Sequence, residues 1–186
     1  SENPILMDFR VSQESAPSFV YLLPYSETEA LVEYTQFSAQ FSYDKQIYES
    51  ELNQYIHKQL GIADFTVTEK EDGSIPMTNF EFDSRPHDRV FRIGTVGGDT
   101  KPTTGYTFVN VQKHAVEILN ILSGLQIEKT DNSRFRFYDT LLLQIMLEQP
   151  TLVKTIMKFL FKNQPMSRVL KFLDEETVVL EEMIIM

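Results

Sequence analysis

The chain has 186 residues, a net charge of −10 and 42% hydrophobic residues, a composition typical of globular proteins that excludes a disordered or low-complexity chain. It has no cysteine and three widely separated histidines, which argues against disulfides, a cysteine nucleophile and a metal site and is typical of a reducing compartment such as the cytoplasm. The acidic charge argues against a nucleic-acid partner, and neither a signal peptide nor an apolar run of the ~20 residues needed to span a membrane is recognisable.

The first third of the chain is rich in β-branched and aromatic residues between prolines and polar turns. Three segments therefore predict strands: residues 5–11, 17–24 and 29–37. The short gap at residues 26–28 predicts a hairpin between the second and the third. Residues 46–60 change to helical spacing, and Gly61 ends the predicted helix.

Further along the chain, residues 65–71 and 74–82 predict extended segments around an Asp72-Gly73 turn, and residues 90–96 predict a strand. Helical spacing then dominates and predicts five helices: residues 108–122, 135–147, 151–162, 166–173 and 175–185. Strands followed by helices indicate an α+β fold. We expect a mainly antiparallel sheet domain over 1–89, a strand and helix over 90–124, and a helical region over 125–186.

A glycine-rich motif at residues 97–106 reads Gly-Gly-Asp-Thr-Lys-Pro-Thr-Thr-Gly-Tyr. Glycines let a ligand approach the backbone closely, and a helix start presents unpaired N–H groups that suit an anion. The carboxylate of Asp99 can accept hydrogen bonds from sugar-like hydroxyls. The same pattern also suits an ordinary strand–turn–helix joint, with Thr103 or Thr104 as the N-cap.

This motif resembles the second flavin-binding motif of FAD enzymes related to aromatic hydroxylases, and its Pro-Thr-Thr-Gly-Tyr part resembles the lycopene cyclases. The resemblance implies that the Gly-Asp step holds the ribityl and pyrophosphate part of FAD, and that the helix start lies against the pyrimidine edge of the isoalloxazine. It assigns cofactor contacts to Gly97, Gly98, Asp99, Pro102, Thr103, Thr104 and Gly105. Cyclases usually differ at the acidic position and often carry a histidine before the proline. This chain has Asp99 and Lys101 there, which leaves a related reductase or hydroxylase open.

The resemblance extends to the predicted strands. Residues 19–24 and 30–35 are similar to two cyclase segments that carry an acidic motif, and Glu33 matches the glutamate assigned as essential. Tyr34 stands where a second carboxylate is usual. Met7-Asp8 and residues 71–77 resemble two further segments. The resemblance implies a lipophilic carotenoid substrate. It also implies reduced FAD as a cofactor, which NAD(P)H keeps reduced and which undergoes no net redox change in the reaction.

Cyclisation of a linear polyene begins when an acid protonates the terminal double bond. Burial among apolar side chains raises the pKa of a carboxyl group and keeps it protonated near neutral pH, so we expect Glu33 to be buried and catalytic. Strand alternation places Leu31, Glu33, Thr35 and Phe37 on one face and Val32 and Tyr34 on the other. Aromatic rings stabilise a carbocation, and we expect Tyr21, Tyr34 and Phe37 to contact the substrate. The alternative is a solvated strand glutamate in a salt bridge.

Residues 150–173 carry five cations and no acid. Lys154, Lys158 and Lys162 repeat every four residues and form one ridge beside apolar positions. This pattern predicts a helix lying on a membrane surface, or a core helix whose lysines face water.

The sequence thus indicates the C-terminal, substrate-side part of a lycopene-cyclase-type flavoprotein that forms β-type rings, with an antiparallel sheet domain, part of an FAD-binding domain and a helical region. The G-x-G-x-x-G unit of such proteins is absent, so we expect this chain alone to bind FAD weakly or not at all and to be inactive. A flavin-dependent hydroxylase or isoprenoid reductase, and a non-enzymatic lipid-binding or interaction module, remain alternatives.

Overall fold

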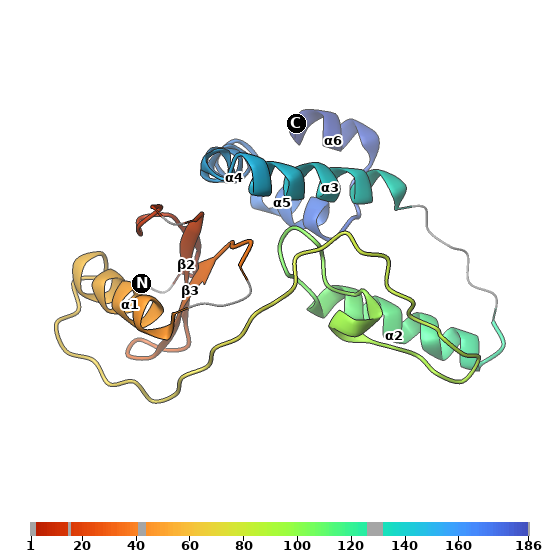
Figure 1. The fold of residues 1–186 in the computed structure, drawn as a ribbon, viewed down its shortest axis with the longest axis horizontal. Helices are drawn as coiled ribbons and strands as arrows, with labels where there is room; N and C mark the ends of the chain where they lie inside the picture. The colour runs from red at the N-terminus through yellow and green to blue at the C-terminus, as the bar shows by residue number, and fades with distance from the viewer. Residues whose placement is uncertain (1–2, 15, 41–43, 126–131, 186) are drawn as a thin grey trace. The chain divides into compact units, whose positions relative to one another are not determined.

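The computed structural model describes residues 3–14, 16–40, 44–125 and 132–185. The described residues form a three-stranded antiparallel sheet and six α-helices, which confirms the α+β class (Figure 1). They divide into two compact units: Ser1–Ser74 with Gln149–Thr155, and Ile75–Glu148 with Ile156–Met186. The predicted boundaries after residues 89 and 124 both fall inside the second unit.

The sheet of the first unit has the order β1-β2-β3, with β1 at Ile5–Asp8, β2 at Ser18–Pro24 and β3 at Ala30–Gln36. All neighbouring strands are antiparallel. The backbone N–H groups of Tyr25 and Ser26 donate to the carbonyl oxygen of Glu29, at 2.8 and 3.0 Å, and close the turn between β2 and β3. The predicted hairpin is therefore confirmed.

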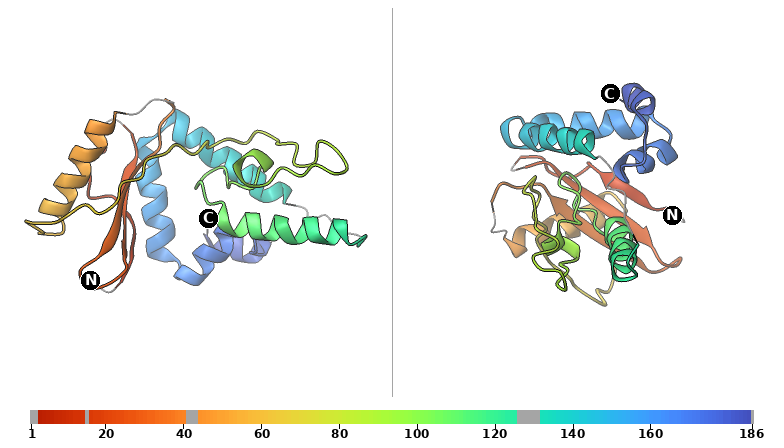
Figure 2. Two further views of the ribbon diagram at one scale, coloured as in Figure 1. Left: turned by 90° about the horizontal axis from the view of Figure 1, so that it is seen from below. Right: turned by 90° about the vertical axis from the view of Figure 1, so that its right-hand side faces the viewer.

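Helix α1 (Lys45–Lys58) lies against one face of this sheet (Figure 2). The Asp44 side chain caps its first turn by accepting from the N–H of Gln46 at 2.9 Å. Val20, Tyr34 and Tyr55 form the buried core between helix and sheet. Burial of each such side chain contributes about 1.5–3 kcal/mol to stability, so this layer is what holds the small sheet in place.

Residues 61–93 contain no strand, and their one β-bridge joins His87 to Val90 (Figure 1). The strands predicted over 65–71, 74–82 and 90–96 are therefore wrong. Several of their apolar residues remain exposed, among them Val67 by 51% and Phe80 by 68%. β-branched and aromatic residues favour a strand only when a neighbouring strand pairs with them, and these segments have no such partner among the described residues.

The second unit is helical. It holds the short 3-10 helix η1 (Gly94–Gly97) and the α-helices α2 (Phe108–Leu122), α3 (Ser133–Glu148), α5 (Met166–Leu173) and α6 (Val179–Ile185), together with most of α4 (Thr151–Asn163). Pro150 and Pro165 directly precede α4 and α5, as predicted. A proline lacks a backbone N–H and therefore ends a helix or begins the next one.

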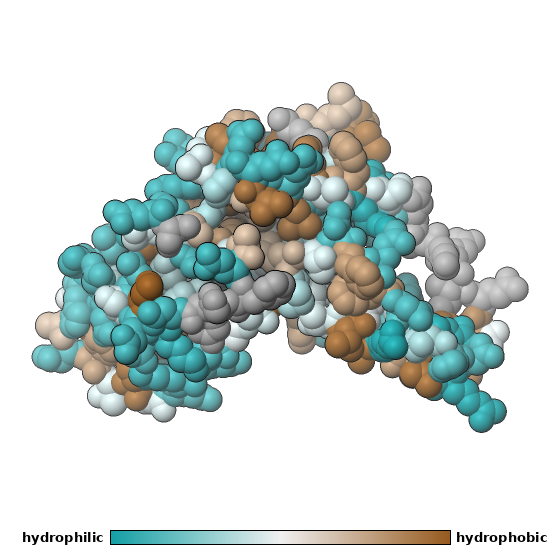
Figure 3. All heavy atoms as spheres, viewed as in Figure 1, coloured by the Kyte–Doolittle hydropathy of each residue, from teal (hydrophilic) through white to brown (hydrophobic). Residues whose placement is uncertain are grey.

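Several apolar side chains of the helices reach the surface, where Figure 3 shows brown patches within a largely hydrophilic exterior. No residue of α2 is buried, and Phe108, Leu119 and Leu122 are exposed by 75%, 63% and 68%. Among the described residues, no helix combines the length and hydrophobicity that crossing a membrane requires.

Candidate active site and cofactor site

Glu33 on β3 lies directly opposite Tyr21 on β2, so both residues belong to the same face of the sheet. Aromatic rings gather on that face around Phe19, whose centroid lies 5.6 Å from Phe9, 5.1 Å from Tyr21 and 5.3 Å from Phe37. The structure thus brings Glu33, Tyr21 and Phe37 together on one surface, of which strand alternation predicted the shared face of Glu33 and Phe37.

The side chain of Glu33 is exposed. Its Oε1 accepts a hydrogen bond of 3.0 Å from the Thr35 hydroxyl. The prediction that Glu33 is buried is therefore wrong for this chain. The physical reason is that no described residue covers this part of the sheet face, where the neighbouring Leu31 is also 38% exposed.

Tyr34 lies on the opposite face, where its strand partner is Val20. It is only 7% exposed, and its ring centroid lies 5.0 Å from that of Tyr48 on α1. Burial raises the pKa of the Tyr34 hydroxyl, which keeps it protonated. The structure therefore separates Tyr34 from Glu33 and places it in the core, not in a substrate site shared with Tyr21.

A polar network at the edge of this core joins β1 to α1. The Asp8 carboxylate accepts hydrogen bonds from Arg10 Nη2 at 2.6 Å and from the Tyr55 hydroxyl at 2.7 Å. Burial disfavours the ionised form of Asp8, but hydrogen bonds from Arg10 and Tyr55 outweigh it and lower the pKa of Asp8. Burial and the hydrogen bond to Asp8 raise the pKa of Tyr55 to about 12.

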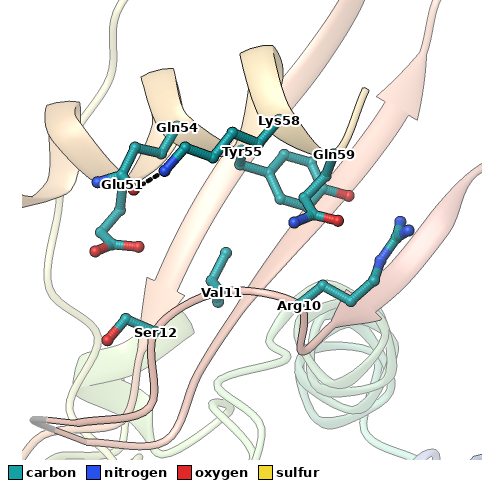
Figure 4. A pocket seen from close by; sticks show the side chains of 8 residues that line it. All are labelled: Arg10, Val11, Ser12, Glu51, Gln54, Tyr55, Lys58 and Gln59. Atoms are coloured by element: carbon teal, nitrogen blue, oxygen red, sulfur yellow. Dashed lines mark hydrogen bonds between the residues drawn. The ribbon is translucent and has the colours of Figure 1, made fainter. Parts of the chain in front are cut away.

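A pocket of about 230 Å³ lies beside this network. Figure 4 shows residues 10–12 along one side and α1 along the other, with Lys58 donating to Gln54 Oε1 at 3.0 Å. Most of the residues that line it have polar or charged side chains, and Tyr55 reaches it from the α1 side of the sheet. Glu33 does not line this pocket, so a substrate held there would not meet the predicted catalytic acid.

The glycine turn, Gly97-Gly98, lies at the end of η1 in the second unit. A Cβ atom on Gly97 would overlap the carbonyl oxygen of Arg92. Gly98 adopts a left-handed conformation with φ of 85°, and a Cβ atom there would lie 3.1 Å from Cβ of Phe82. Both glycines are therefore required by the packing of the turn itself.

Asp99 closes the same turn and ties it to α2. Its Oδ2 accepts from the backbone N–H of Gly94 at 2.6 Å, and its Oδ1 lies 2.8 Å from Nδ1 of His114. The carbonyl oxygen of Asp99 accepts from Asn110 Nδ2 at 2.9 Å. With 9% exposure and both carboxylate oxygens directed to its own chain, Asp99 does not present the free acceptor for sugar-like hydroxyls that the sequence suggested.

Lys101 is buried in an ion-pair network. Its Nζ lies 3.0 Å from Asp139 Oδ2 on α3 and 2.9 Å from Glu175 Oε1, which follows α5. The other oxygen of Asp139 accepts from the Thr103 hydroxyl at 2.6 Å, and the other oxygen of Glu175 accepts from Asn132 Nδ2 at 2.8 Å. These contacts fix the start of the Pro-Thr-Thr-Gly segment against α3.

Helix α2 begins at Phe108, with Thr107 as its N-cap, so the alternative N-caps at Thr103 and Thr104 are wrong. The hydroxyl of Thr107 donates to the carbonyl oxygen of Gly105 at 3.1 Å and leaves the first turn of α2 without a side-chain cap. A largely apolar pocket of about 500 Å³ opens at this helix start, between residues of α2 and α5.

These features fit one part of FAD and not another. The uncapped helix start and the adjacent apolar pocket suit a flat ring system with a negatively charged edge. Pro102, Thr104 and Gly105 are partly exposed, and Gly105 and Thr107 line the pocket. Asp99 does not suit the ribityl chain, because its carboxylate already accepts from Gly94 and His114. Among the described residues, no group of three His, Cys, Asp or Glu side chains could hold a metal ion.

The basic segment 150–173 has one buried and one exposed side along α4. Val153 and Met157 are buried, whereas the three lysines of the ridge are exposed (Lys154, Lys158 and Lys162). Leu152 and Phe159 are also exposed, by 43% and 53%. An exposed face that combines lysines with apolar residues is compatible with both interpretations of the sequence, a membrane-surface helix and a solvated core helix.

Comparison with known proteins shows the family of this chain. A family model described as "Lycopene cyclase protein" matches residues 1–186. The chain belongs to the lycopene cyclase family. A "Lycopene beta-cyclase" from Pantoea ananas is 31% identical over 130 residues, which are 67% of this chain and 32% of that protein. The chain thus spans about a third of the length of this curated relative. No solved structure matches the chain significantly.

Sequence reasoning missed several residues of these networks in the lycopene cyclase chain. His114 pairs with Asp99, which is 15 positions away. Asp139 pairs with Thr103 and Lys101, 36 and 38 positions away, and Glu175 pairs with Lys101, 74 positions away. A lysine that replaces the usual residue before Pro102 was the one available signal, since a buried lysine requires carboxylate partners elsewhere in the fold.

Proposed function

We propose that the protein carrying this chain cyclises the end groups of a linear carotenoid, lycopene, to β-type rings. Membership of the lycopene cyclase family is the observation that carries this proposal. The relative from Pantoea ananas, a lycopene β-cyclase by name, supports the choice of substrate and ring type. The reaction is an isomerisation, since the proton gained in the first step is lost in the last and no electrons are transferred.

Glu33 is the proposed proton donor. Its carboxyl group adds a proton to the terminal double bond, the neighbouring double bond closes the ring onto the resulting cation, and loss of a proton completes the product. Tyr21 and Phe37 share its sheet face and stabilise the passing positive charge, by on the order of 1–2 kcal/mol for each well-placed ring.

Glu33 can hold its proton at neutral pH only when its face of the sheet is shielded from water, because a carboxyl group in bulk water is ionised there. We propose that the apolar substrate, or polypeptide corresponding to the two thirds of the relative outside this match, covers Leu31, Glu33 and the rings beside them in the working enzyme.

Reduced FAD is the proposed cofactor, kept reduced by NAD(P)H, and when bound it supplies negative charge that stabilises the cationic reaction path. The uncapped start of α2 and the pocket between α2 and α5 support a place for the flavin ring. The segment 102–107 would position that ring, whereas the Asp99 carboxylate holds the glycine turn together through Gly94 and His114.

Product mass after reaction in D₂O tests this chemistry. A full-length enzyme that starts cyclisation by protonation gains one deuterium per ring, and it consumes no NAD(P)H in proportion to product. A hydroxylase or reductase would instead consume one NAD(P)H per product and add oxygen or hydrogen. Deuterium-free rings, or stoichiometric consumption of NAD(P)H, would exclude the proposed reaction.

A further inference from the structure

We infer that the buried cluster of Lys101, Asp139 and Glu175 is the positioning device of the flavin-binding segment 102–107, so that its loss weakens FAD binding without unfolding the protein. This inference rests on the flavin role proposed above. Nothing in the family match assigns a role to these three residues.

Burial shows that the cluster is more than a surface ion pair. The side chains of Lys101 and Asp139 are 4% and 6% exposed, and that of Glu175 is 18% exposed. Buried charges are costly unless they are paired and hydrogen-bonded, and removal of one member leaves its partners unpaired. The pairing of these buried charges therefore restrains the position of Lys101.

The backbone of Lys101 transmits that position to the segment. Its N–H donates to the carbonyl oxygen of Tyr106 at 2.8 Å, and its carbonyl oxygen accepts from the N–H of Gly105 at 3.0 Å. Lys101 thus closes the loop that ends where α2 begins. The bond between Thr103 and Asp139, at 2.6 Å, is a second tie between this loop and α3.

The end of helix α5 places Glu175 for its contacts in the cluster. The backbone φ of Glu175 is 62°, in the left-handed region that residues other than glycine and asparagine adopt less often. This φ belongs to the ending of α5, where the N–H of Glu175 donates to the carbonyl oxygen of Phe172 at 3.1 Å and the N–H of Glu176 donates to that of Lys171 at 2.9 Å. Here the Glu175 carboxylate meets both Lys101, at 2.9 Å, and Asn132, at 2.8 Å.

A neighbouring ion pair provides a matched control. Lys113 on α2 pairs with Glu176 at 2.9 Å, but their side chains are 45% and 55% exposed. Exposed pairs contribute little to stability and are screened by salt. Loss of Lys113 should therefore leave the segment 102–107 where it is.

The test compares K101M, T103V and K113M with the wild type in the full-length protein that carries this chain. For each variant, FAD titration gives the dissociation constant, the visible spectrum reports the surroundings of the bound flavin, and hydrogen–deuterium exchange reports opening of residues 102–107. Thermal unfolding monitors the fold.

We expect K101M to raise the dissociation constant for FAD at least tenfold and to speed exchange in 102–107. T103V keeps every charge and should raise this constant about threefold and shift the absorption maxima of the bound flavin. K113M should match the wild type within twofold. If K101M does not fold, T103V decides the question alone.

The inference is overturned if K101M, or T103V in its place, binds FAD within twofold of the wild type. It is also overturned if exchange rises equally across α3 and α5, which would indicate a general role in folding. A wild type that binds no FAD would instead defeat the proposed flavin role, while exchange in 102–107 would still decide whether the cluster positions the segment.

Discussion

The hydrogen bond between Tyr55 and Asp8 gives the sharpest stability prediction. Tyr55→Phe removes one hydroxyl from a side chain that is 2% exposed and leaves the ring in the core beneath α1. Asp8 keeps its hydrogen bonds from Arg10, at 2.6–3.0 Å, so no buried carboxylate is left without partners. The loss is therefore that of one hydrogen bond to a charged group, about 1.5–3 kcal/mol.

The effect depends on pH in a defined direction. The pKa of Asp8 is lower in the folded chain than in the unfolded chain, because hydrogen bonds from Arg10 and Tyr55 outweigh burial. A lowered carboxyl pKa contributes stability above the unfolded value, about 3.9, and this contribution is lost as the pH falls through the folded value. Tyr55→Phe should thus cost more stability at pH 7 than at pH 2.5.

Urea unfolding followed by circular dichroism at both pH values measures this difference. A loss of about 2 kcal/mol also lowers the thermal midpoint by about 4–8 °C in a chain of this size. Tyr25→Phe, at a side chain that is 70% exposed, is the control and should change stability by less than about 0.5 kcal/mol. Equal stability of Tyr55→Phe and wild type at pH 7, or an equal loss at both pH values, would refute the reasoning.

Two further predictions concern the glycine turn and the lysine ridge of α4. Gly97→Ala should destabilise the protein by about 1–3 kcal/mol, because the added Cβ overlaps the backbone of Arg92, whereas Gly73→Ala, in open space, should shift the thermal midpoint by less than 2 °C. The membrane-surface interpretation of the lysine ridge predicts that changing its three lysines to glutamate abolishes flotation with anionic liposomes without altering the thermal midpoint. Flotation equal to that of the wild type would discard membrane binding.

Local patterns predicted the parts of this fold that depend on local physics. The β2–β3 hairpin follows from a polar three-residue turn between two apolar runs, and α3, α4 and α5 follow from helical spacing interrupted by Pro150 and Pro165. The predicted strands at 65–71, 74–82 and 90–96 were wrong, because a strand needs a partner and the local pattern does not contain one.

In the candidate sites, too, local patterns predicted what lies within one strand but not the contacts between distant segments. Alternation along β3 correctly placed Glu33 and Tyr34 on opposite faces, but exposure depends on what covers each face, and this is not encoded in the strand itself. The partners of Lys101 and Asp8 lie 38 and 47 positions away, at Asp139 and Tyr55, and no spacing rule connects them. The networks around both motifs therefore became visible only in the folded chain.

The pigment formed by the full-length enzyme with Glu33→Gln tests the central claim most directly. In cells that accumulate lycopene, the wild type should convert it to a product with β-type rings. The variant cannot donate the first proton and should leave lycopene unchanged while it binds FAD as tightly as the wild type. Cyclic product from Glu33→Gln at the wild-type rate would remove Glu33 from the reaction.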